Sequence, residues 1–320
     1  MMDSNKGGVL VSGGAGFIGK ALIKEILKKK IPLVSFDVVD KPDSLPEQGS
    51  GFNWFNFSYL DANKRRDEIK TIVTEHNIKT VIHLATTMFP ADSRKKIIED
   101  CFENVYSNVS FFKELYESGC EKIIFASSGG TVYGKSESSF SEESEISPEI
   151  SYGLSKATTE TYLRFLANEY NKKSISLRIS NPYGEGQRFD GKQGVIPIFI
   201  NKIFNDIPLD IIGSLDSRRD YIHISDLVNA FICAIYYEGF YDTFNIGSGE
   251  SVALKELIKI IELKLNKNSL INEVSSQVLD KKGVTLIIQR AKNELNWLPA
   301  VKLNDGIEQL IESFRCADYE

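Results

Sequence analysis

The chain has 320 residues, of which 38 are Lys or Arg, 44 are Asp or Glu, and 42% are hydrophobic. This length corresponds to about two domains, and the apolar fraction predicts a sizeable core, which excludes disordered and fibrous architectures. The net charge is −6, and charges of both signs are mixed along the chain. Because no strongly basic face is available to neutralise a phosphate backbone, we expect no nucleic-acid partner.

Strand and helix patterns alternate along the first 180 residues. Apolar runs predict strands at residues 9–11, 32–36, 80–84, 122–126 and 174–179, and helical periodicity predicts helices over 20–30, 93–118 and 151–170. Near-continuous apolar strands that alternate with helices indicate an α/β fold, a doubly wound parallel (Rossmann) sheet covered on both faces. We expect this domain over residues 1–180. A smaller α/β domain of loops, short helices and isolated strands is expected mainly over 181–320, with segments near 220–247 returning to the sheet.

The cysteines and histidines predict neither a metal site nor a disulfide scaffold. The four cysteines lie far apart and form no C-x-x-C pair. The three histidines, His76, His83 and His223, fall in strand or helix patterns, which favours structural roles. The N-terminus has too few apolar residues for a secretory signal, and no 18-residue apolar run predicts a membrane span. We therefore expect a cytoplasmic protein with no membrane partner.

A glycine-rich loop joins the first predicted strand to the first predicted helix. Its sequence from Gly13 to Gly19 contains G-x-x-G-x-x-G, with Gly16 in the middle and with Phe17 and Ile18 before the last glycine. Glycines in this position let the backbone approach a pyrophosphate at the N-terminus of a helix. The second strand ends at Asp37, whose carboxylate can accept hydrogen bonds from a ribose 2′-OH and would repel a 2′-phosphate. The loop and the acid together predict NAD rather than NADP.

Tyr152 and Lys156 are four residues apart on the predicted helix 151–170, hence on one face of it. A nearby ammonium group favours the phenolate and should lower the pKa of Tyr152 from about 10, which makes the tyrosine a usable base. The pair opens the helix that follows the polar strand end at residues 126–134, at the edge where doubly wound sheets bind ligands. This placement predicts a catalytic pair.

These motifs, taken in order, resemble those of the extended short-chain dehydrogenase/reductase family, in its nucleotide-sugar epimerase and dehydratase branch. The matching segments are residues 13–19, Asp37, 83–85, 127–134, Tyr152 with Lys156, 181–184, 219–223 and 244–247. The resemblance covers nearly the whole chain and implies NAD as cofactor, a nucleotide sugar as substrate and a homodimer. The helices near 93–118 and 151–170 would form the dimer contact, and the first of them carries Phe111, Phe112, Leu115 and Tyr116, which a buried intrachain face explains equally well.

The resemblance also implies roles for individual residues. Cofactor contacts fall on Gly13, Gly16, Phe17, Ile18, Gly19, Asp37, Leu84, Ala85, Tyr152 and Lys156. Tyr152 is the expected acid/base, and Lys156 is expected to hold the nicotinamide ribose. Asn181 and Arg219 are expected to contact the diphosphate of the sugar nucleotide, which suits an amide and a planar cation. The adenine contact is expected from Ser58 or Asp61, because the usual acidic residue is displaced here.

Gly129 departs from the family pattern, which usually has a catalytic Ser or Thr at this position. Ser128 or Thr131 is expected to supply the missing hydroxyl, with a slight preference for Ser128. The Asp-Glu pair that sugar dehydratases need corresponds here to Gly130-Thr131, which disfavours dehydration.

Three functions remain after these exclusions. The leading hypothesis is a 4-epimerase of a UDP- or dTDP-hexose, which passes through a 4-keto intermediate with no net oxidation. The alternative is an NAD(P)H-dependent reductase of a nucleotide-linked 4-keto-6-deoxyhexose. A nucleotide-sugar or NAD-sensing binding protein is the third, although binding alone would not require the pair Tyr152 and Lys156. Substrate choice is expected in loops that include residues 187–197.

Overall fold

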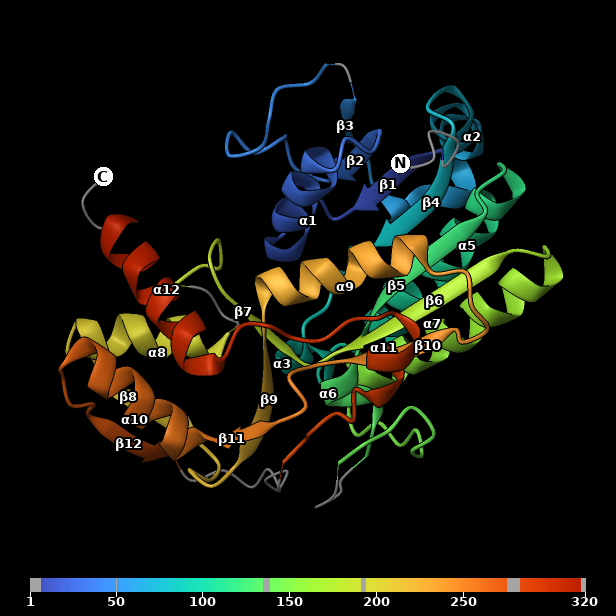
Figure 1. Cartoon of the computed structure of the whole chain (residues 1–320). Helices are drawn as coiled ribbons and strands as arrows, with labels where there is room; N and C mark the ends of the chain where they lie inside the picture. Colours follow the sequence, from blue (N-terminus) through green and yellow to red (C-terminus); the bar gives the residue numbers. More distant parts are fainter. Residues whose placement is uncertain (1–6, 50, 135–138, 191–193, 275–282, 318–320) are drawn as a thin grey trace. The chain divides into compact units, whose positions relative to one another are not determined.

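The computed structural model of the chain describes residues 7–49, 51–134, 139–190, 194–274 and 283–317 (Figure 1). The N-terminal residues 1–6, on which the signal-sequence prediction depends, and residues 191–193 of the expected substrate loop lie outside the described residues. The chain divides into two compact units. The first comprises Met1–Gly134, Glu145–Arg178 and Ala230–Phe244, and the second comprises Lys135–Ser144, Ile179–Asn229 and Asn245–Glu320.

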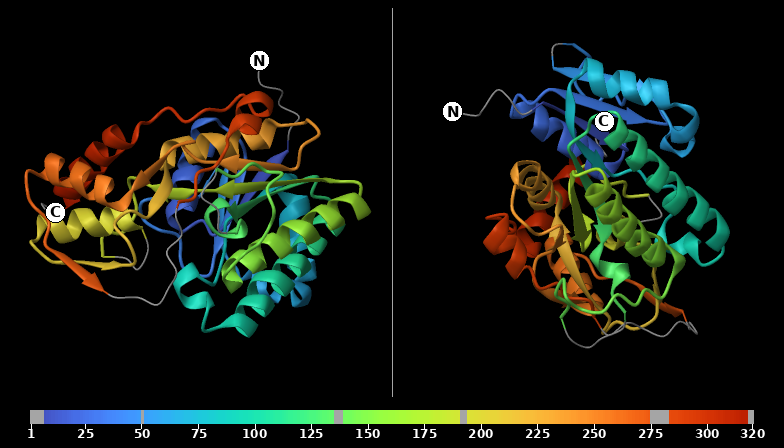
Figure 2. Two further views of the ribbon diagram at one scale, coloured as in Figure 1. Left: turned by 90° about the horizontal axis from the view of Figure 1, so that it is seen from below. Right: turned by 90° about the vertical axis from the view of Figure 1, so that its right-hand side faces the viewer.

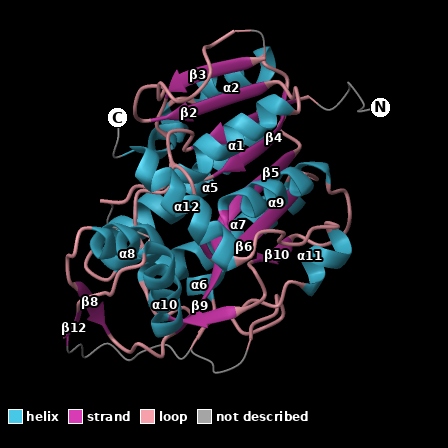
Figure 3. Cartoon of the chain, turned by 60° about the vertical axis from the view of Figure 1, so that its left-hand side comes forward, coloured by secondary structure: helices cyan, strands magenta, loops and turns pink. Residues whose placement is uncertain are grey.

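Within the described residues, seven strands form one sheet in the order β10-β6-β5-β4-β1-β2-β3, which Figure 3 shows in magenta. The strands are β1 (Gly8–Ser12), β2 (Leu33–Asp37), β3 (Phe52–Asn56), β4 (Ile78–His83), β5 (Lys122–Ser128), β6 (Lys173–Ile179) and β10 (Thr243–Ile246). Strands β1 to β5 pair in parallel. The strand order reverses between β1 and β4, which is the point where such sheets bind ligands. The predicted doubly wound α/β fold is confirmed.

Helices cover both faces of the sheet (Figure 2). The helix α1 (Phe17–Lys28) lies on one face, and α2 (Arg66–Glu75), α5 (Ser107–Glu117) and α7 (Ser151–Glu169) lie on the other. Side chains of the latter three helices form one buried cluster with Leu10, Val34, Val81 and Ile123 from the strands. Because successive strand residues point to opposite faces, the neighbours of these residues pack toward the other face, and strands buried on both faces read as continuous apolar runs.

The predicted helix over 93–118 is interrupted. It consists of α3 (Pro90–Ser93), α4 (Ile97–Cys101), the π-helical turn η2 (Phe102–Tyr106) and α5. Phe111, Phe112, Leu115 and Tyr116 on α5 belong to the buried cluster beneath the sheet. Of the two roles that the sequence left open for them, the buried intrachain face is therefore the one that the structure shows.

Three consecutive elements of the first unit, β3, η1 and α2, were not predicted. Strand β3 reads Phe-Asn-Trp-Phe-Asn, and its asparagines hide it because they are uncommon in strands. Helix α2 and the preceding 3-10 helix η1 (Tyr59–Lys64) are rich in charged residues, so only three buried side chains of α2 mark its inner face. Strand β3 is the edge strand of the sheet on this side.

The second unit contains longer helices than expected. The longer ones are α8 (Val195–Phe204), α10 (Leu254–Leu265) and α12 (Leu303–Ala317). Helix α11 (Gln289–Glu294) is short, and α9 (Ile224–Tyr236) begins in this unit and ends in the first. Its small sheets contain β7 (Asn181–Tyr183), β9 (Arg218–His223) and β11 (Ser251–Ala253), and β8 (Leu209–Ile212) with β12 (Ile271–Val274). The expectation of short helices was wrong although the signal was present: Leu257, Ile258, Ile261 and Leu265 recur at helical spacing on α10 and are buried.

None of the helices in the described part of the chain combines the length and the apolar run needed to cross a membrane.

Candidate active site

The glycine loop leaves no room for side chains. Gly13 has a φ of +73°, and a Cβ added to it would lie 2.9 Å from the backbone nitrogen of Ala85. A Cβ on Gly19 would lie 2.2 Å from the carbonyl oxygen of Gly13, so this glycine lets α1 pack directly on the loop. Gly16 begins α1 without a side-chain cap, and no acidic residue lies in the first turn, which includes Phe17 and Ile18. The helix N-terminus therefore offers amide groups and a positive dipole end to an anion.

Asp37 is fixed beside this loop at the end of β2. Its Oδ2 accepts a hydrogen bond from the backbone N–H of Ala15 at 3.0 Å, and its Oδ1 accepts one from Val38 N–H at 2.8 Å. The carboxylate is partly exposed, and it retains lone pairs for ribose hydroxyls. The loop, the uncapped helix and this acid fit the pyrophosphate and adenosine ribose of NAD.

Strand β4 ends in a buried polar cluster that positions Leu84 and Ala85. Both of their backbone N–H groups donate to Ser12 Oγ, at 3.1 and 3.3 Å. His83 is hydrogen-bonded through Nδ1 to Ser12 Oγ at 2.8 Å and through Nε2 to Asn108 Oδ1 at 2.9 Å. Burial, and after it the positive charge of Lys156, lower the pKa of His83 to about 3. His83 is thus a neutral structural residue in a fully engaged network.

The two residues predicted to contact adenine lie near the end of β3 but have local partners. Ser58 Oγ accepts a hydrogen bond from Leu60 N–H at 3.4 Å and caps η1. Asp61 forms an exposed ion pair with Lys64 at 3.2 Å. An exposed pair of this kind contributes little to stability, so Asp61 can exchange partners at low cost.

Tyr152 and Lys156 lie on one face of α7 beside the end of β5, as their spacing predicts. Lys156 is buried; its Nζ donates to the carbonyl oxygen of Ala126 at 2.9 Å and lies 5.6 Å from the centre of the Tyr152 ring and 4.6 Å from that of Phe125. Burial lowers the pKa of Lys156 to about 8, against the opposing charges of Asp100 and Glu160.

The acid–base state of Tyr152 differs from the prediction. Burial raises the pKa of Tyr152 to about 12, and the negative charge of Asp100 raises it as well. The predicted lowering of this pKa by Lys156 is not found, because the two causes of the shift, desolvation of the phenolate and then the charge of Asp100, both raise the pKa. Tyr152 is therefore held as a protonated phenol, suited to give a proton.

The residues that follow β5 form a short turn, α6 (Gly129–Val132), packed against the start of α7. A Cβ on Gly153 would lie 2.2 Å from the carbonyl oxygen of Thr131, so the contact is as close as glycine permits. Thr131 Oγ1 is buried and has no hydrogen-bond partner among the described residues. Ser128, at the N-terminal boundary of the turn, is partly exposed and does not cap it. Both hydroxyls predicted to replace that of the family's residue at Gly129 are thus at this turn.

Asp100 on α4 is a buried acid that sequence reasoning missed. It is 0% exposed, and its charge acts on both Tyr152 and Lys156. Its neighbour Glu99 is exposed, and the chain letters alone do not distinguish the two.

The two residues predicted to hold the substrate diphosphate lie on neighbouring strands of the second unit. Strand β7 pairs in parallel with β9, and Asn181 is opposite Tyr221. Asn181 Nδ2 donates to the carbonyl oxygen of Asp220 at 2.8 Å. Arg219 donates to the carbonyl oxygen of Arg218 at 2.7 Å and to Ser217 Oγ at 3.1 Å, contacts that fold it along its own strand.

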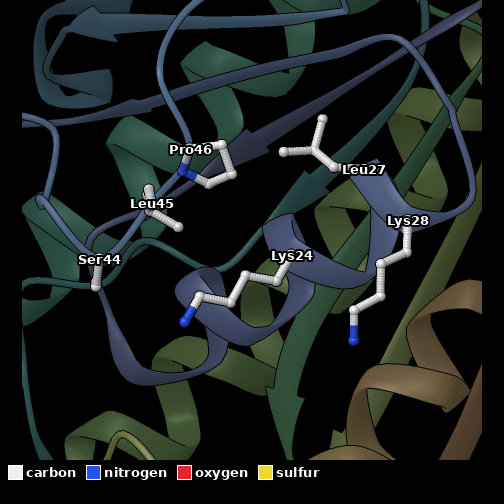
Figure 4. Close-up of a pocket in the computed structure, with 6 residues that line it drawn as sticks. All are labelled: Lys24, Leu27, Lys28, Ser44, Leu45 and Pro46. Atoms are coloured by element: carbon white, nitrogen blue, oxygen red, sulfur yellow. The ribbon is translucent and has the colours of Figure 1, made fainter.

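A surface pocket of about 520 Å³ lies between α1 and the loop after β2 (Figure 4). Its lining residues are Lys24, Leu27, Lys28, Ser44, Leu45 and Pro46. None of the predicted site residues contributes to it.

Comparisons with known proteins agree with this geometry. The family model described as "NAD dependent epimerase/dehydratase family" matches residues 9–247. An Escherichia coli protein named dTDP-4-dehydro-6-deoxyglucose reductase is 66% identical over 98% of this chain and 100% of its own. Among solved structures, the UDP-glucose 4-epimerase of Thermotoga maritima with UDP-glucose has a TM-score of 0.88 and 28% identity, and covers 97% of this chain and 99% of its own. The Thermus thermophilus UDP-glucose 4-epimerase complexed with NAD has a TM-score of 0.86 and 25% identity, with the same coverage. This chain belongs to the NAD-dependent epimerase/dehydratase family and uses NAD as its cofactor.

Proposed function

We propose that this protein is a reductase of a dTDP-linked 4-keto-6-deoxyhexose, which converts the C4 carbonyl to a hydroxyl at the expense of NADH. The observation that carries the proposal is the 66% identity, over nearly the full length of both chains, to the Escherichia coli dTDP-4-dehydro-6-deoxyglucose reductase. The 4-epimerase hypothesis, which sequence reasoning favoured, has support from relatives at 27% and 28% identity. The reductase alternative is therefore better supported.

The protonation state of Tyr152 is compatible with this direction of reaction. A reductase must add a proton to the carbonyl oxygen, whereas an epimerase first has to remove one from a hydroxyl. Because the pKa of Tyr152 is raised to about 12, the phenol is protonated across the neutral range and is ready to donate.

The roles of this chain's residues follow from that chemistry. NADH, when bound, supplies the hydride. The glycine loop and Asp37 orient the NADH molecule. Tyr152 gives its proton to the sugar O4, and Lys156 holds a hydroxyl of the nicotinamide ribose and stabilises the phenolate that remains. Asn181 and Arg219, in the second unit, bind the substrate diphosphate. In this proposal the first unit is the NAD-binding domain and the second supplies the sugar-nucleotide contacts.

A second hydroxyl at the turn α6 completes the proposed site. Thr131 Oγ1 is buried with no hydrogen-bond partner among the described residues. A hydrogen bond to a ligand oxygen would offset the cost of burying this hydroxyl. We therefore place Thr131 ahead of Ser128 as the donor to the sugar O4. Thr131→Val should lower kcat by about tenfold, and Ser128→Ala should lower it less. The reverse order would assign the role to Ser128.

Homodimerisation is also part of the proposal, through the two helical segments near 93–118 and 151–170 that the family resemblance implies. Large apolar side chains are exposed on α4, η2 and α7: Ile97, Ile98, Phe102, Tyr106, Leu154, Tyr162 and Phe165. Phe102 and Tyr106 stack with ring centres 5.1 Å apart. An apolar patch of this kind on neighbouring helices is typical of a subunit contact, and a second copy would cover it. Phe102→Glu with Phe165→Glu should convert a dimer to a monomer in sedimentation, and an unchanged dimer would reject this surface.

The proposed reaction is tested by supplying the purified protein with dTDP-4-keto-6-deoxyglucose and NADH. One NADH should be oxidised for each sugar reduced, followed as loss of absorbance at 340 nm. Interconversion of C4-epimeric dTDP- or UDP-hexoses without added NADH would instead support the epimerase.

A further inference from the structure

A buried ion pair joins α7 to β6 in the first unit. Glu160 on α7 and Arg178 on β6 are both buried, and they form a forked contact. Arg178 donates to Glu160 Oε2 through Nε at 3.1 Å and through Nη2 at 2.8 Å, and its Nε also lies 3.2 Å from Oε1. Replacement of a buried ion pair by packed apolar side chains is often neutral or stabilising, so stability alone does not account for this pair.

The ion pair is hydrogen-bonded to the chain on both sides of the turn α6. Before the turn, the buried Ser127 at the end of β5 donates through Oγ to Glu160 Oε1. After the turn, the buried Tyr133 accepts at Oη from Arg178 Nη1 at 2.9 Å. The guanidinium carbon of Arg178 also lies 5.1 Å from the centre of the Tyr133 ring. One ion pair thus holds both ends of the turn Gly129–Val132.

This turn and its N-terminal boundary carry the hydroxyls that we place opposite the substrate. Ser128 is the residue next to Ser127, and Thr131 lies two residues before Tyr133. The hydroxyl of a Ser or Thr is one bond away from Cβ, so its position follows the backbone closely. The contacts of Ser127 and Tyr133 therefore limit where both hydroxyls can lie.

Two neighbouring side chains on one face of α7 bind two consecutive residues of β5. Lys156 and Glu160 are four residues apart, which places them on the same face of the helix. Lys156 Nζ donates to the carbonyl oxygen of Ala126 at 2.9 Å, and Glu160 accepts from Ser127. The helix that carries Tyr152 is thus fixed against the strand end from which the turn begins.

We propose that Glu160, together with Arg178, is a positioning residue of the reaction. The pair fixes the turn α6 against α7, so that a hydroxyl of the turn stays within reach of the substrate oxygen that Tyr152 protonates. This inference rests on the proposed function, which gives Tyr152 and the hydroxyls their roles. Small displacements of such groups are costly, since a misplacement of about 1 Å can slow a reaction about 100-fold.

The first test is Ser127→Ala, which removes the hydrogen bond between β5 and Glu160 and leaves the ion pair with Arg178 in place. Turnover of dTDP-4-keto-6-deoxyglucose with NADH should fall about tenfold in kcat, while KM and the affinity for NAD stay within about twofold. Thr159→Val is the matched control. Thr159 precedes Glu160 on α7 and is buried, but its Oγ1 donates at 2.9 Å to the carbonyl oxygen of Asn104, in η2. This control should lower the melting temperature at least as much and leave kcat within about twofold.

A double-mutant cycle distinguishes positioning from a structural role. Ser127→Ala is combined with whichever of Thr131→Val and Ser128→Ala slows turnover more. If the ion pair positions that hydroxyl, the two substitutions act on one element, and the double variant should be about as slow as the slower single variant. Effects on kcat that multiply would overturn the proposal, as would a kcat of Ser127→Ala equal to that of the unmodified protein. If Ser127→Ala does not fold, Tyr133→Phe, which removes the contact after the turn, takes its place.

Hydrogen exchange gives a readout that needs no substrate. Amide exchange of peptides that span residues 126–134, followed by mass spectrometry, should be faster in Ser127→Ala than in the unmodified protein and unchanged in Thr159→Val. If the unmodified protein does not reduce the keto sugar, the proposed function is rejected, whereas faster exchange in this segment still supports the ion pair as the group that fixes the turn. Unchanged exchange in Ser127→Ala would overturn the inference.

Discussion

Two strand–helix junctions of the same sheet prepare their ligand sites by opposite means. At the junction of β1 and α1, recognition depends on backbone: glycines clear the space, and the carboxylate of Asp37 is held by two amide groups. At the junction of β5 and α7, the site depends on buried ionisable side chains whose partners are incomplete. Lys156 is buried, with a pKa lowered to about 8, and Asp100 Oδ2 has no hydrogen-bond partner in the part of the chain that the structure describes. The first junction makes room for a ligand by leaving out side-chain atoms, and the second places buried ionisable side chains beside it.

The largest difference between the junctions should appear when the proton donor is removed. Tyr152→Phe should lower kcat by about 1000-fold, because a positioned general acid contributes on the order of 10²–10⁴. Affinity for NAD, measured by calorimetry, should change less than twofold, since the glycine loop is untouched. Unchanged turnover would exclude Tyr152 from the chemistry.

Adding a methyl group to the glycine loop should have the next largest effect. Gly19→Ala places a Cβ 2.2 Å from the Gly13 carbonyl oxygen and should cost about 3 kcal/mol of unfolding free energy, with loss of NAD binding. Gly16→Ala is the control, because its nearest contact is at 3.2 Å and its φ is −68°. It should fold nearly normally and bind NAD weakly. Equal stability of the two variants, measured by denaturant unfolding, would contradict this reading of the loop.

His83, buried at the end of β4, should make the free energy of unfolding depend on pH. The pKa of His83 is lowered to about 3 in the folded protein, below the ordinary value of 6.5, so the unfolded chain binds the additional proton. The contribution of neutral His83 to the free energy of unfolding is present in full above pH 6.5 and is lost as the pH falls. At pH 5 the loss is about 2 kcal/mol. His83→Gln should flatten the decline, whereas His76→Gln should retain it. Equal slopes for both variants in unfolding titrations would assign the decline to other groups.

The smallest expected effect is a change in the preference for NADH over NADPH. Asp37→Ser removes the charge that repels a 2′-phosphate, so the ratio of kcat/KM for NADH to that for NADPH should fall by about tenfold or more. Stability should change little, because Asp37 is partly exposed. An unchanged preference for NADH would mean that a residue other than Asp37 distinguishes the ribose 2′-OH from a 2′-phosphate.

The first junction was readable from the sequence because its chemistry is local. The glycine spacing and the strand end at Asp37 lie within one β-α-β stretch, and the family resemblance rests on the same letters. The spacing of Tyr152 and Lys156 likewise placed them on one helix face. The pKa of Tyr152 was not predictable, because spacing reveals a neighbouring cation but neither the burial of the phenol nor the charge of Asp100, which both raise the pKa.

Asp100 could not be recognised from the sequence for a geometric reason. The π-helical turn Phe102–Tyr106 inserts an irregularity into a segment that reads as one helix, and it shifts the faces on either side of it. Periodicity counted from α5 therefore does not tell which of Glu99 and Asp100 points inward. The same break separates the exposed Phe102 from the buried Phe111, so the sequence alone left open whether the apolar residues of this segment face the core or a partner subunit.

The central claim is net hydride transfer to C4 of a dTDP-linked keto sugar. It is tested most directly with NADH deuterated on the transferred position of the nicotinamide ring. We predict that dTDP-4-keto-6-deoxyglucose gains one deuterium at C4, with one NAD⁺ formed for each sugar reduced. Formation of C4-epimeric hexoses without deuterium and without NAD⁺ release would contradict the account.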